Sequence, residues 1–386
     1  MAQDIAKGMM IIGVIFFHCY LMTFENHTES LQNFNILLAL FPFILCVFFF
    51  YSGYNYKPNN RTYLQNVAKR AKQLLIPMVF AFLISALLIS AMELAFHYNE
   101  AVPTLHAIGN SLLYGLMSEP TAIMIGFPQE GGFIFELALS LGLLWFILAL
   151  FSASLIFFLL VKYTNKRLSV LISIVAILLI AAFCMGEFIG TYLPYAVESY
   201  PIAAALMLVA SYLKQHNFLD RPMDNKKGVA ILIINSLIAE GLIVGTTLFL
   251  HYKVGSMTAG ILPGGMFDSA LGGFDAFISF AFGVLGVYFI HTLSRFIELI
   301  PVVSKGLAWI GKRSAVFYLF HPIFIDLAAI AIFQKGVPWG QAQGFFYTFV
   351  VLLAMILVFL LIEFLMKKFG RKKEAAVEAK EDPDKE

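Results

Sequence analysis

The sequence predicts an all-helical membrane bundle of about ten transmembrane helices, with the N-terminus and the C-terminus in the cytoplasm. Of the 386 residues, 60% are hydrophobic and only 13% are charged. Soluble domains are about 45–50% apolar and about 25% charged. No water-soluble core could bury this much apolar surface, so the composition indicates that lipid surrounds the chain. The formal net charge of +2 gives no indication of a nucleic-acid partner.

Ten apolar runs are long enough to cross a bilayer, which takes about 20 residues of helix. The run at 134–161 exceeds one bilayer thickness, which fits either one tilted helix or a helix with a broken first turn. The first run follows MAQDIAKG without a small-residue cleavage site, so we expect a retained span. The expected spans are 8–24, 36–56, 74–96, 134–161, 168–187, 193–213, 229–251, 273–293, 315–333 and 345–366.

Basic residues gather in alternate loops between these spans. The loops on the other side keep only Lys253 and Lys335. This asymmetry is typical of the positive-inside rule and predicts an even number of spans, although eight or twelve would satisfy it equally. The charged segment 371–386 lacks aromatic residues, and we expect a disordered cytoplasmic tail after a transmembrane domain at 1–370. The expected inner loops are 57–73, 162–167, 214–228 and 294–314.

The first span carries the most informative polar residues. Lys7 opens the helix and His18 follows eleven residues later, which is about three full turns and roughly 16 Å along the axis. The two side chains therefore share one face, with Lys7 at the cytoplasmic surface and His18 inside the membrane. This pair predicts a tunnel that holds a charged ligand head at its mouth. Packing for His18 and a topology signal for Lys7 remain the alternative interpretation.

Further polar residues lie at or near the inner ends of the early spans. Ser52 precedes Gly53 at the end of the second span, where small residues also allow close helix approach. Lys69, Arg70 and Lys72 form a basic cluster before the third span that suits phosphate binding. Attraction to anionic membrane lipid explains such a cluster equally well.

Two polar residues in later spans are further candidates for the same cavity. Glu198 lies in LPYAVESYP near the outer end of its span, and His321 lies in FYLFHPIF. Taken singly, each is explained by packing or by hydrogen bonding between helices.

Six segments, in order, resemble the acyltransferase-3 family of integral membrane acyltransferases. In the first of them, Asp4, Lys7, Gly8 and His18 match the family pattern, although Lys7 stands where arginine is usual and therefore lacks the guanidinium fork. The family's basic R-x-x-R pair fits two registers here, one giving Arg70 and Gln73 and the other Lys69 and Lys72. The similar segments are DIAKGMMIIGVIFFH, FFFYSGY, KRAKQLLIP, LLWFILALF, LPYAVESYP and SAVFYLFHPIF, within about residues 4–330.

The resemblance implies transfer of an acyl group, with acetyl expected, from a cytoplasmic acyl-CoA to a glycan hydroxyl outside the cytoplasm. It implies that His18 is catalytic, because neutral imidazole serves as a general base or accepts the acyl group. CoA phosphates would meet Lys7, Lys69, Arg70 and Lys72, with Ser52 and Trp145 as weaker pocket candidates. Asp4, Glu198 and His321 would line the cavity.

We therefore expect a multi-pass O-acyltransferase of the bacterial inner membrane, with acetyl-CoA as donor and an extracytoplasmic or lipid-linked glycan as acceptor. The expected cell-surface polysaccharide acceptor would be selected by the outer loops 97–133 and 252–272. We expect no metal and no nucleic acid, and membrane lipid as the surroundings. The alternative is a transporter or exporter of a lipid-linked or small polar substrate, with His18, Glu198 and His321 as a relay.

Overall fold

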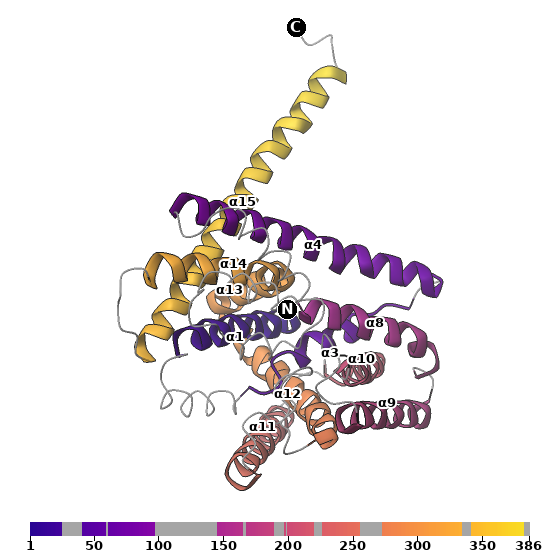
Figure 1. Ribbon diagram of the computed structural model, residues 1–386. Helices are drawn as coiled ribbons and strands as arrows, with labels where there is room; N and C mark the ends of the chain where they lie inside the picture. The colour runs from indigo at the N-terminus through magenta and orange to yellow at the C-terminus, as the bar shows by residue number, and fades with distance from the viewer. Residues whose placement is uncertain are drawn as a thin grey trace.

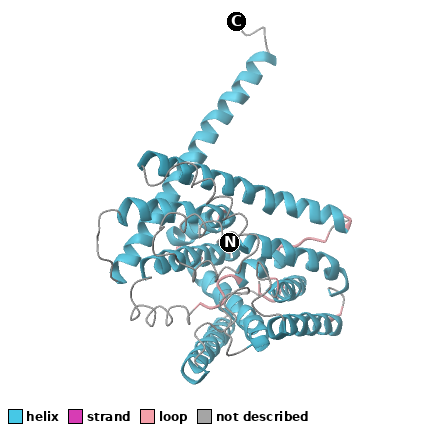
Figure 2. Ribbon diagram, viewed as in Figure 1, coloured by secondary structure: helices cyan, strands magenta, loops and turns pink. Residues whose placement is uncertain are grey.

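A computed structural model describes residues 1–24, 41–58, 61–96, 145–164, 167–188, 197, 199–219, 226–254, 272–333 and 341–381. Regular structure in these ranges is entirely helical (Figure 2), which confirms the predicted fold class there. The helices are α1 (Ala2–Phe24), α3 (Cys46–Tyr54), α4 (Tyr63–Phe96), α8 (Trp145–Thr164), α9 (Leu168–Phe188), α10 (Ser199–Gln215), α11 (Lys226–Val254), η3 (Gly272–Phe274), α12 (Asp275–Ile297), α13 (Pro301–Lys312), α14 (Ser314–Phe333) and α15 (Gln341–Glu381).

Each of the ten predicted spans overlaps one of these helices. Within the described ranges, six helical segments are long and apolar enough to cross a bilayer by length and composition. The chain is thus a multi-pass membrane protein, while the count of ten and the orientation stay predictions. The six segments are Ala2–Cys19, Phe146–Thr164, Leu168–Phe188, Lys227–Leu250, Asp275–Ile297 and Phe346–Met366.

Two shorter helices form the centre of the bundle. Helix α3 has nine residues, or about 14 Å of helix, which is less than the thickness of a bilayer. Helix α10 has 17 residues, and Ile202 through Leu208 are at most 1% exposed. A helix that is apolar all round belongs in a core, and α10 packs against α3, α8, α9 and α12.

The contact between α3 and α10 depends on Gly53. A Cβ atom added there would lie 2.1 Å from the carbonyl oxygen of Met207 and 2.5 Å from its Cα atom. Only glycine therefore allows the two backbones to approach this closely. The contact fixes the position of Ser52, which precedes Gly53 on the same helix.

Substitution of Gly53 by alanine should destabilise the bundle, because the new methyl group meets backbone rather than a flexible side chain. Overpacking of a well-packed core costs about 1–3 kcal/mol, so we expect a lower thermal unfolding midpoint for the purified protein in detergent. The matched control is Gly306→Ala in α13, where an added Cβ has no neighbour within 4 Å. An unchanged midpoint for Gly53→Ala would contradict the close approach.

Helices α9, α11 and α15 lie at the periphery of the bundle. Only about a fifth of each apolar segment is buried inside the protein, with 22% for α9 and 17% for each of the others. Large apolar side chains such as Ile177, Leu237 and Leu361 are exposed along them. Such surfaces require lipid.

Helix α15 continues well beyond the last predicted span. It is helical to Glu381 and therefore covers most of 371–386, for which the sequence predicts a disordered tail. In Figure 1 this C-terminal part extends away from the other helices. The domain boundary at 370 stays a prediction.

Helix α1 lies among α12, α13, α14 and α15 and packs most extensively against α13. Its Gly8 and the Gly311 of α13 face each other, and a Cβ atom on Gly311 would overlap the carbonyl group of Asp4. The sequence predicts an inner loop at 294–314, whereas the structure places the short helix α13 there. This contact fixes the end of α1 that carries Lys7.

Candidate active site

A cavity of about 910 Å³ lies where α1, α3, α4, α8, α10 and α14 meet. Side chains at its rim, such as Lys57 and Arg61, are exposed, whereas Phe146 and Tyr318 on its wall are buried. The cavity therefore leads from a polar opening to an apolar interior. Its lining residues are Lys7, Phe48, Tyr51, Ser52, Asn55, Tyr56, Lys57, Arg61, Asn66, Lys69, Arg70, Gln73, Leu74, Phe146, Ile147, Leu150, Phe157, Phe158, Met207, Ser314, Ala315 and Tyr318.

The charge of this cavity has one sign. Five of its described lining residues are cations, and no described lining residue is an aspartate or a glutamate. A concave surface with charges of one sign concentrates ligands of the opposite sign. The cavity is therefore suited to an anion with several charges. The five cations are Lys7, Lys57, Arg61, Lys69 and Arg70.

Arg70 lies partly buried in the wall of the cavity. Its Nε donates to Oγ of Ser154 over 3.2 Å, and one terminal nitrogen donates to Oγ of Ser52 over 2.5 Å. Ser154 in turn donates to the carbonyl oxygen of Leu150 over 2.6 Å, which leaves its oxygen free to accept. Two neutral hydroxyls thus orient the guanidinium group without neutralising it.

Among the described residues, the other N–H groups of Arg70 have no hydrogen-bond acceptor, so they can donate to a ligand. A guanidinium has five N–H groups, and the described residues account for two of them. Burial lowers the pKa of Arg70 to about 10, so the group is still charged at neutral pH. A planar fork of N–H donors matches the geometry of a phosphate.

The structure distinguishes between the two registers of the basic cluster on α4. Asn66, Lys69, Arg70 and Gln73 all line the cavity, as residues spaced by three or four positions on one helical face should. Lys72 is exposed and is not among the lining residues. It lies about 200° around the helix from Arg70, at about 100° per residue. The geometry favours the register that contains Arg70 and Gln73.

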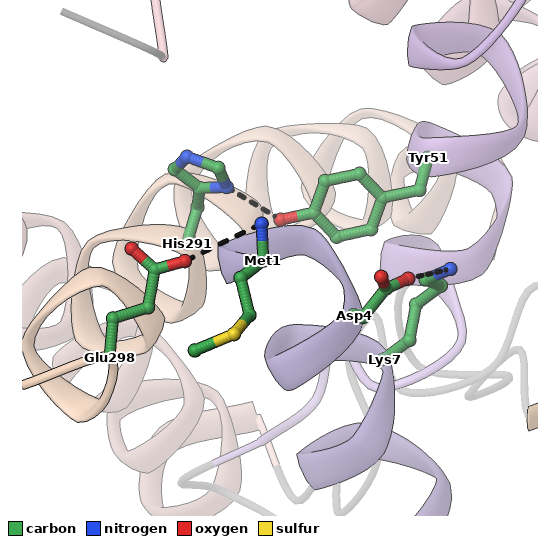
Figure 3. Close-up of polar contacts among 6 residues, drawn as sticks. All are labelled: Met1, Asp4, Lys7, Tyr51, His291 and Glu298. Atoms are coloured by element: carbon green, nitrogen blue, oxygen red, sulfur yellow. Dashed lines mark hydrogen bonds and ion pairs between the residues drawn. The ribbon is translucent and has the colours of Figure 1, made fainter. Parts of the chain in front are cut away.

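Lys7 reaches the cavity from α1 and is paired with Asp4. The Lys7 ammonium lies 2.7 Å from a carboxylate oxygen of Asp4, one helical turn earlier (Figure 3). Asp4 itself is not a lining residue; it acts on the cavity through this ion pair.

Tyr51 connects the cavity to α12. Its hydroxyl shares a 2.8 Å hydrogen bond with Nδ1 of the buried His291, as Figure 3 shows. In the same view the N-terminal amine of Met1 lies 3.5 Å from the carboxylate of Glu298. His291 and Glu298 line a second, smaller polar pocket of about 230 Å³ beside the first residues of α1.

Aromatic rings form the inner end of the cavity and continue beyond it. The rings of Phe146 and Tyr318 lie 5.1 Å apart, and those of Tyr318 and His321 lie 5.4 Å apart. The ring of His321 in turn lies 5.2 Å from that of His18. His18 and His321 do not line the cavity themselves, so they lie behind Tyr318.

The helices account for this convergence. On α14, Ser314 and Tyr318 line the cavity and His321 follows at a spacing of three residues, so all three share one face. Lys7 and His18 likewise share one face of α1. Both helices begin at the cavity, and their histidines meet further along. His321 lies about 10 Å from Ser314 along α14, and His18 lies about 16 Å from Lys7 along α1.

Several predicted site residues are not placed. Glu198 and most of the loops 97–133 and 252–272 lie outside the described residues. Trp145 begins α8, but its side chain is also outside them, and its neighbour Phe146 lines the cavity.

Other cavity residues were missed by the sequence interpretation. Lys57 and Arg61 belong to the predicted inner loop 57–73, where their charges predict only topology, yet both line the cavity. The seven-residue spacing from Ser314 to His321 could have identified Tyr318 between them.

The arrangement can bind a polyanion and carry out proton or acyl transfer nearby. The cations and the aromatic wall suit a charged head with a slender apolar arm, and the two imidazoles can accept protons or an acyl group. Among the described residues, no group of three or more histidine, cysteine, aspartate or glutamate side chains is arranged to hold a metal ion.

Comparison with known families gives one match. The family model Acyltransferase 3, described as an acyltransferase domain, matches residues 2–363, which is nearly the whole chain. No curated protein and no solved structure matches the chain.

Proposed function

The chain belongs to the acyltransferase 3 family and is a membrane acyltransferase, and on that premise we propose both its donor and its acceptor. The donor is a cytoplasmic acyl-CoA, with acetyl as the expected acyl group. The acceptor is a hydroxyl group of an extracytoplasmic or lipid-linked glycan. The observation that carries the proposal is the cavity with five cations. At its inner end, the lining residue Tyr318 contacts His321, which in turn contacts His18.

The basic half of the cavity supports the choice of donor. The pyrophosphate and the 3′-phosphate of a CoA carry several negative charges, and Arg70 with its neighbours Lys69 and Arg61 would bind them. A charge-assisted hydrogen bond is worth about 1.5–3 kcal/mol. A neutral sugar or a simple ester donor would use none of these cations.

The apolar half supports the position of the thioester. Phe48, Phe146 and Leu74 would surround the pantetheine arm, and Tyr318 marks the inner end that the acyl group approaches. The arm is uncharged, so its entry into this apolar wall leaves no charge without a partner. The thioester would then lie at the Tyr318 end of the cavity, which is the end nearest to the two histidines.

His18 supplies the chemistry in this proposal. Its neutral imidazole removes the proton of the acceptor hydroxyl, the oxygen bonds to the acyl carbon and the carbon–sulfur bond breaks. The proton ends on the sulfur, and CoA leaves as a thiol. Alternatively, the ring nitrogen carries the acyl group in a covalent intermediate before the hydroxyl attacks.

The decisive experiment uses inverted membrane vesicles from cells with and without the gene. These vesicles expose the predicted cytoplasmic side, and they are supplied with acetyl-CoA labelled in the acetyl group. We expect label in the lipid-linked or polymeric glycan fraction and an equal amount of free CoA thiol, only when the gene is present. Mass spectrometry of the labelled fraction would then identify the acceptor.

A different outcome would contradict the proposal. The same amount of labelled glycan with and without the gene, or gene-dependent release of CoA thiol with no label in any glycan, would contradict the proposed reaction. Gene-dependent glycan export that follows an ion gradient and needs no acyl-CoA would favour the transporter interpretation.

A further inference from the structure

The contacts of His321 give it a defined place between the cavity and His18. Its ring lies 5.4 Å from Tyr318, which lines the cavity, and 5.2 Å from His18, with a 32° tilt between the imidazoles. The His321 side chain is fully buried. The His321 ring therefore contacts both a residue of the cavity lining and His18.

The backbone sets the tautomer of His321. Nδ1 lies 2.6 Å from the carbonyl oxygen of Tyr318, one turn earlier on α14. A carbonyl oxygen can only accept a hydrogen bond, so Nδ1 must carry the proton. In the neutral ring, Nε2 is then the nitrogen with the lone pair, and it is the one that can accept a proton.

Nε2 of His321 has no hydrogen-bond partner among the described residues, although it is buried. Buried polar atoms without partners are uncommon in folded proteins and call for an explanation. A ring that is held by one nitrogen and open at the other is arranged to exchange a proton at that second position.

Resting on the proposed function, we infer that His321 is a second catalytic imidazole that returns a proton to the departing CoA sulfur. His18 takes the proton from the acceptor hydroxyl as the new carbon–oxygen bond forms and the carbon–sulfur bond breaks. His18 then passes this proton to Nε2 of His321, and Nε2 gives it to the thiolate. Both imidazoles end neutral, and Nδ1 stays bonded to the Tyr318 carbonyl throughout.

The position of His321 relative to the cavity fixes this division of roles. His321 follows Tyr318 by one turn on α14 and contacts its ring, whereas His18 lies outside the cavity lining and contacts the ring of His321. His321 is therefore the imidazole nearer to the donor. A thiolate left in an apolar interior is a buried charge, which protonation removes.

The test uses two variants and two donors. His321→Asn keeps an amide N–H near the position of Nδ1 for the Tyr318 carbonyl but removes the accepting nitrogen. His321→Gln places an amide near the position of Nε2, which cannot take up a proton either. Each variant is assayed in inverted vesicles with acetyl-CoA and with S-acetyl-4-nitrothiophenol, whose thiolate is stable without protonation.

We expect His321→Asn to lower the rate with acetyl-CoA by about 10²-fold or more, the usual range for loss of a general acid. With the aryl thioester, the loss should be less than about tenfold, because its leaving group needs no proton. The KM for acetyl-CoA and the yield of monodisperse protein in detergent should stay close to wild type. His321→Gln should give the same pattern.

Two results would overturn the inference. An equal loss with both donors would mean that His321 only supports the structure, and an unchanged rate with acetyl-CoA would exclude any role. The proposed function is tested separately by wild type and His18→Ala in the same assay. A wild type that transfers nothing from acetyl-CoA, or a fully active His18→Ala, contradicts the proposed function and this inference with it.

Discussion

Replacement of His18 by alanine should abolish acceptor acylation while leaving insertion and folding intact. Loss of a general base slows proton transfer by about 10²–10⁴-fold, and loss of an acyl-accepting ring stops the covalent route altogether. His18 is partly exposed and alanine is smaller and a good helix former, so α1 should tolerate the substitution. The measurement is incorporation of labelled acetyl groups in inverted vesicles, normalised to the amount of protein.

A matched control tests whether the loss of activity is specific to His18 or follows the removal of another histidine. His216→Ala removes an exposed histidine directly after α10, where its ring contacts that of Tyr212 at 4.4 Å. That variant should keep wild-type activity. If His18→Ala retains full activity at normal expression, His18 has no part in the chemistry.

Replacement of Arg70 by glutamine should weaken donor binding far more than it slows the chemical step. Loss of one charge-assisted hydrogen bond to phosphate predicts a KM for acyl-CoA that is about 10–100-fold higher, with kcat nearly unchanged. Arg70→Lys should restore little, since an ammonium cannot hold Ser52, Ser154 and a phosphate in one plane.

The control for Arg70 lies two residues away on the same helix. Lys72→Gln removes an equal charge from the exposed face of α4, outside the cavity, and should change KM less than about threefold. Comparable effects from both substitutions would indicate that only the total surface charge matters. A larger effect from Lys72 than from Arg70 would reverse the register that the geometry favours.

Apolar runs and charge predicted where the helices lie in the sequence better than they predicted which helices are buried and which face lipid. Apolar runs located every described span helix, because a bilayer requires long apolar segments. They did not distinguish the buried α10 from the lipid-facing α9, since both sequences are apolar all round. Helix α13 was missed because its twelve residues are too short and too polar to be recognised as a span.

The candidate site was predictable where it follows a single helix. The spacing of Lys7 and His18 predicted a shared face of α1, and the structure places Lys7 in the cavity lining and the His18 ring beside His321. The neighbours of a residue on other helices cannot be read from one sequence. The contact between His18 and His321 joins residues 303 positions apart, and the fixed tautomer of His321 depends on a carbonyl group.

The basic cluster shows the same limit at short range. Lys69, Arg70 and Lys72 are equivalent in sequence, and only the rotation of α4 against α8 and α14 decides which of them face inward. Lys57 and Arg61, which lie between α3 and α4, join them in the cavity lining. The positive-inside rule places these basic residues on one side of the membrane but does not predict which of them bind a ligand.

The charge of the cavity also bears on turnover under the proposed function. Its cations would contact only phosphates, which the reaction leaves unchanged, so spent CoA would bind about as tightly as the loaded donor. Binding of this kind brings the donor in but does not favour the transition state over the ground state. Product inhibition by free CoA follows directly, and departure of the spent carrier becomes a candidate for the slowest step of the cycle. The rate of the enzyme in the cell would then depend on the ratio of acyl-CoA to free CoA.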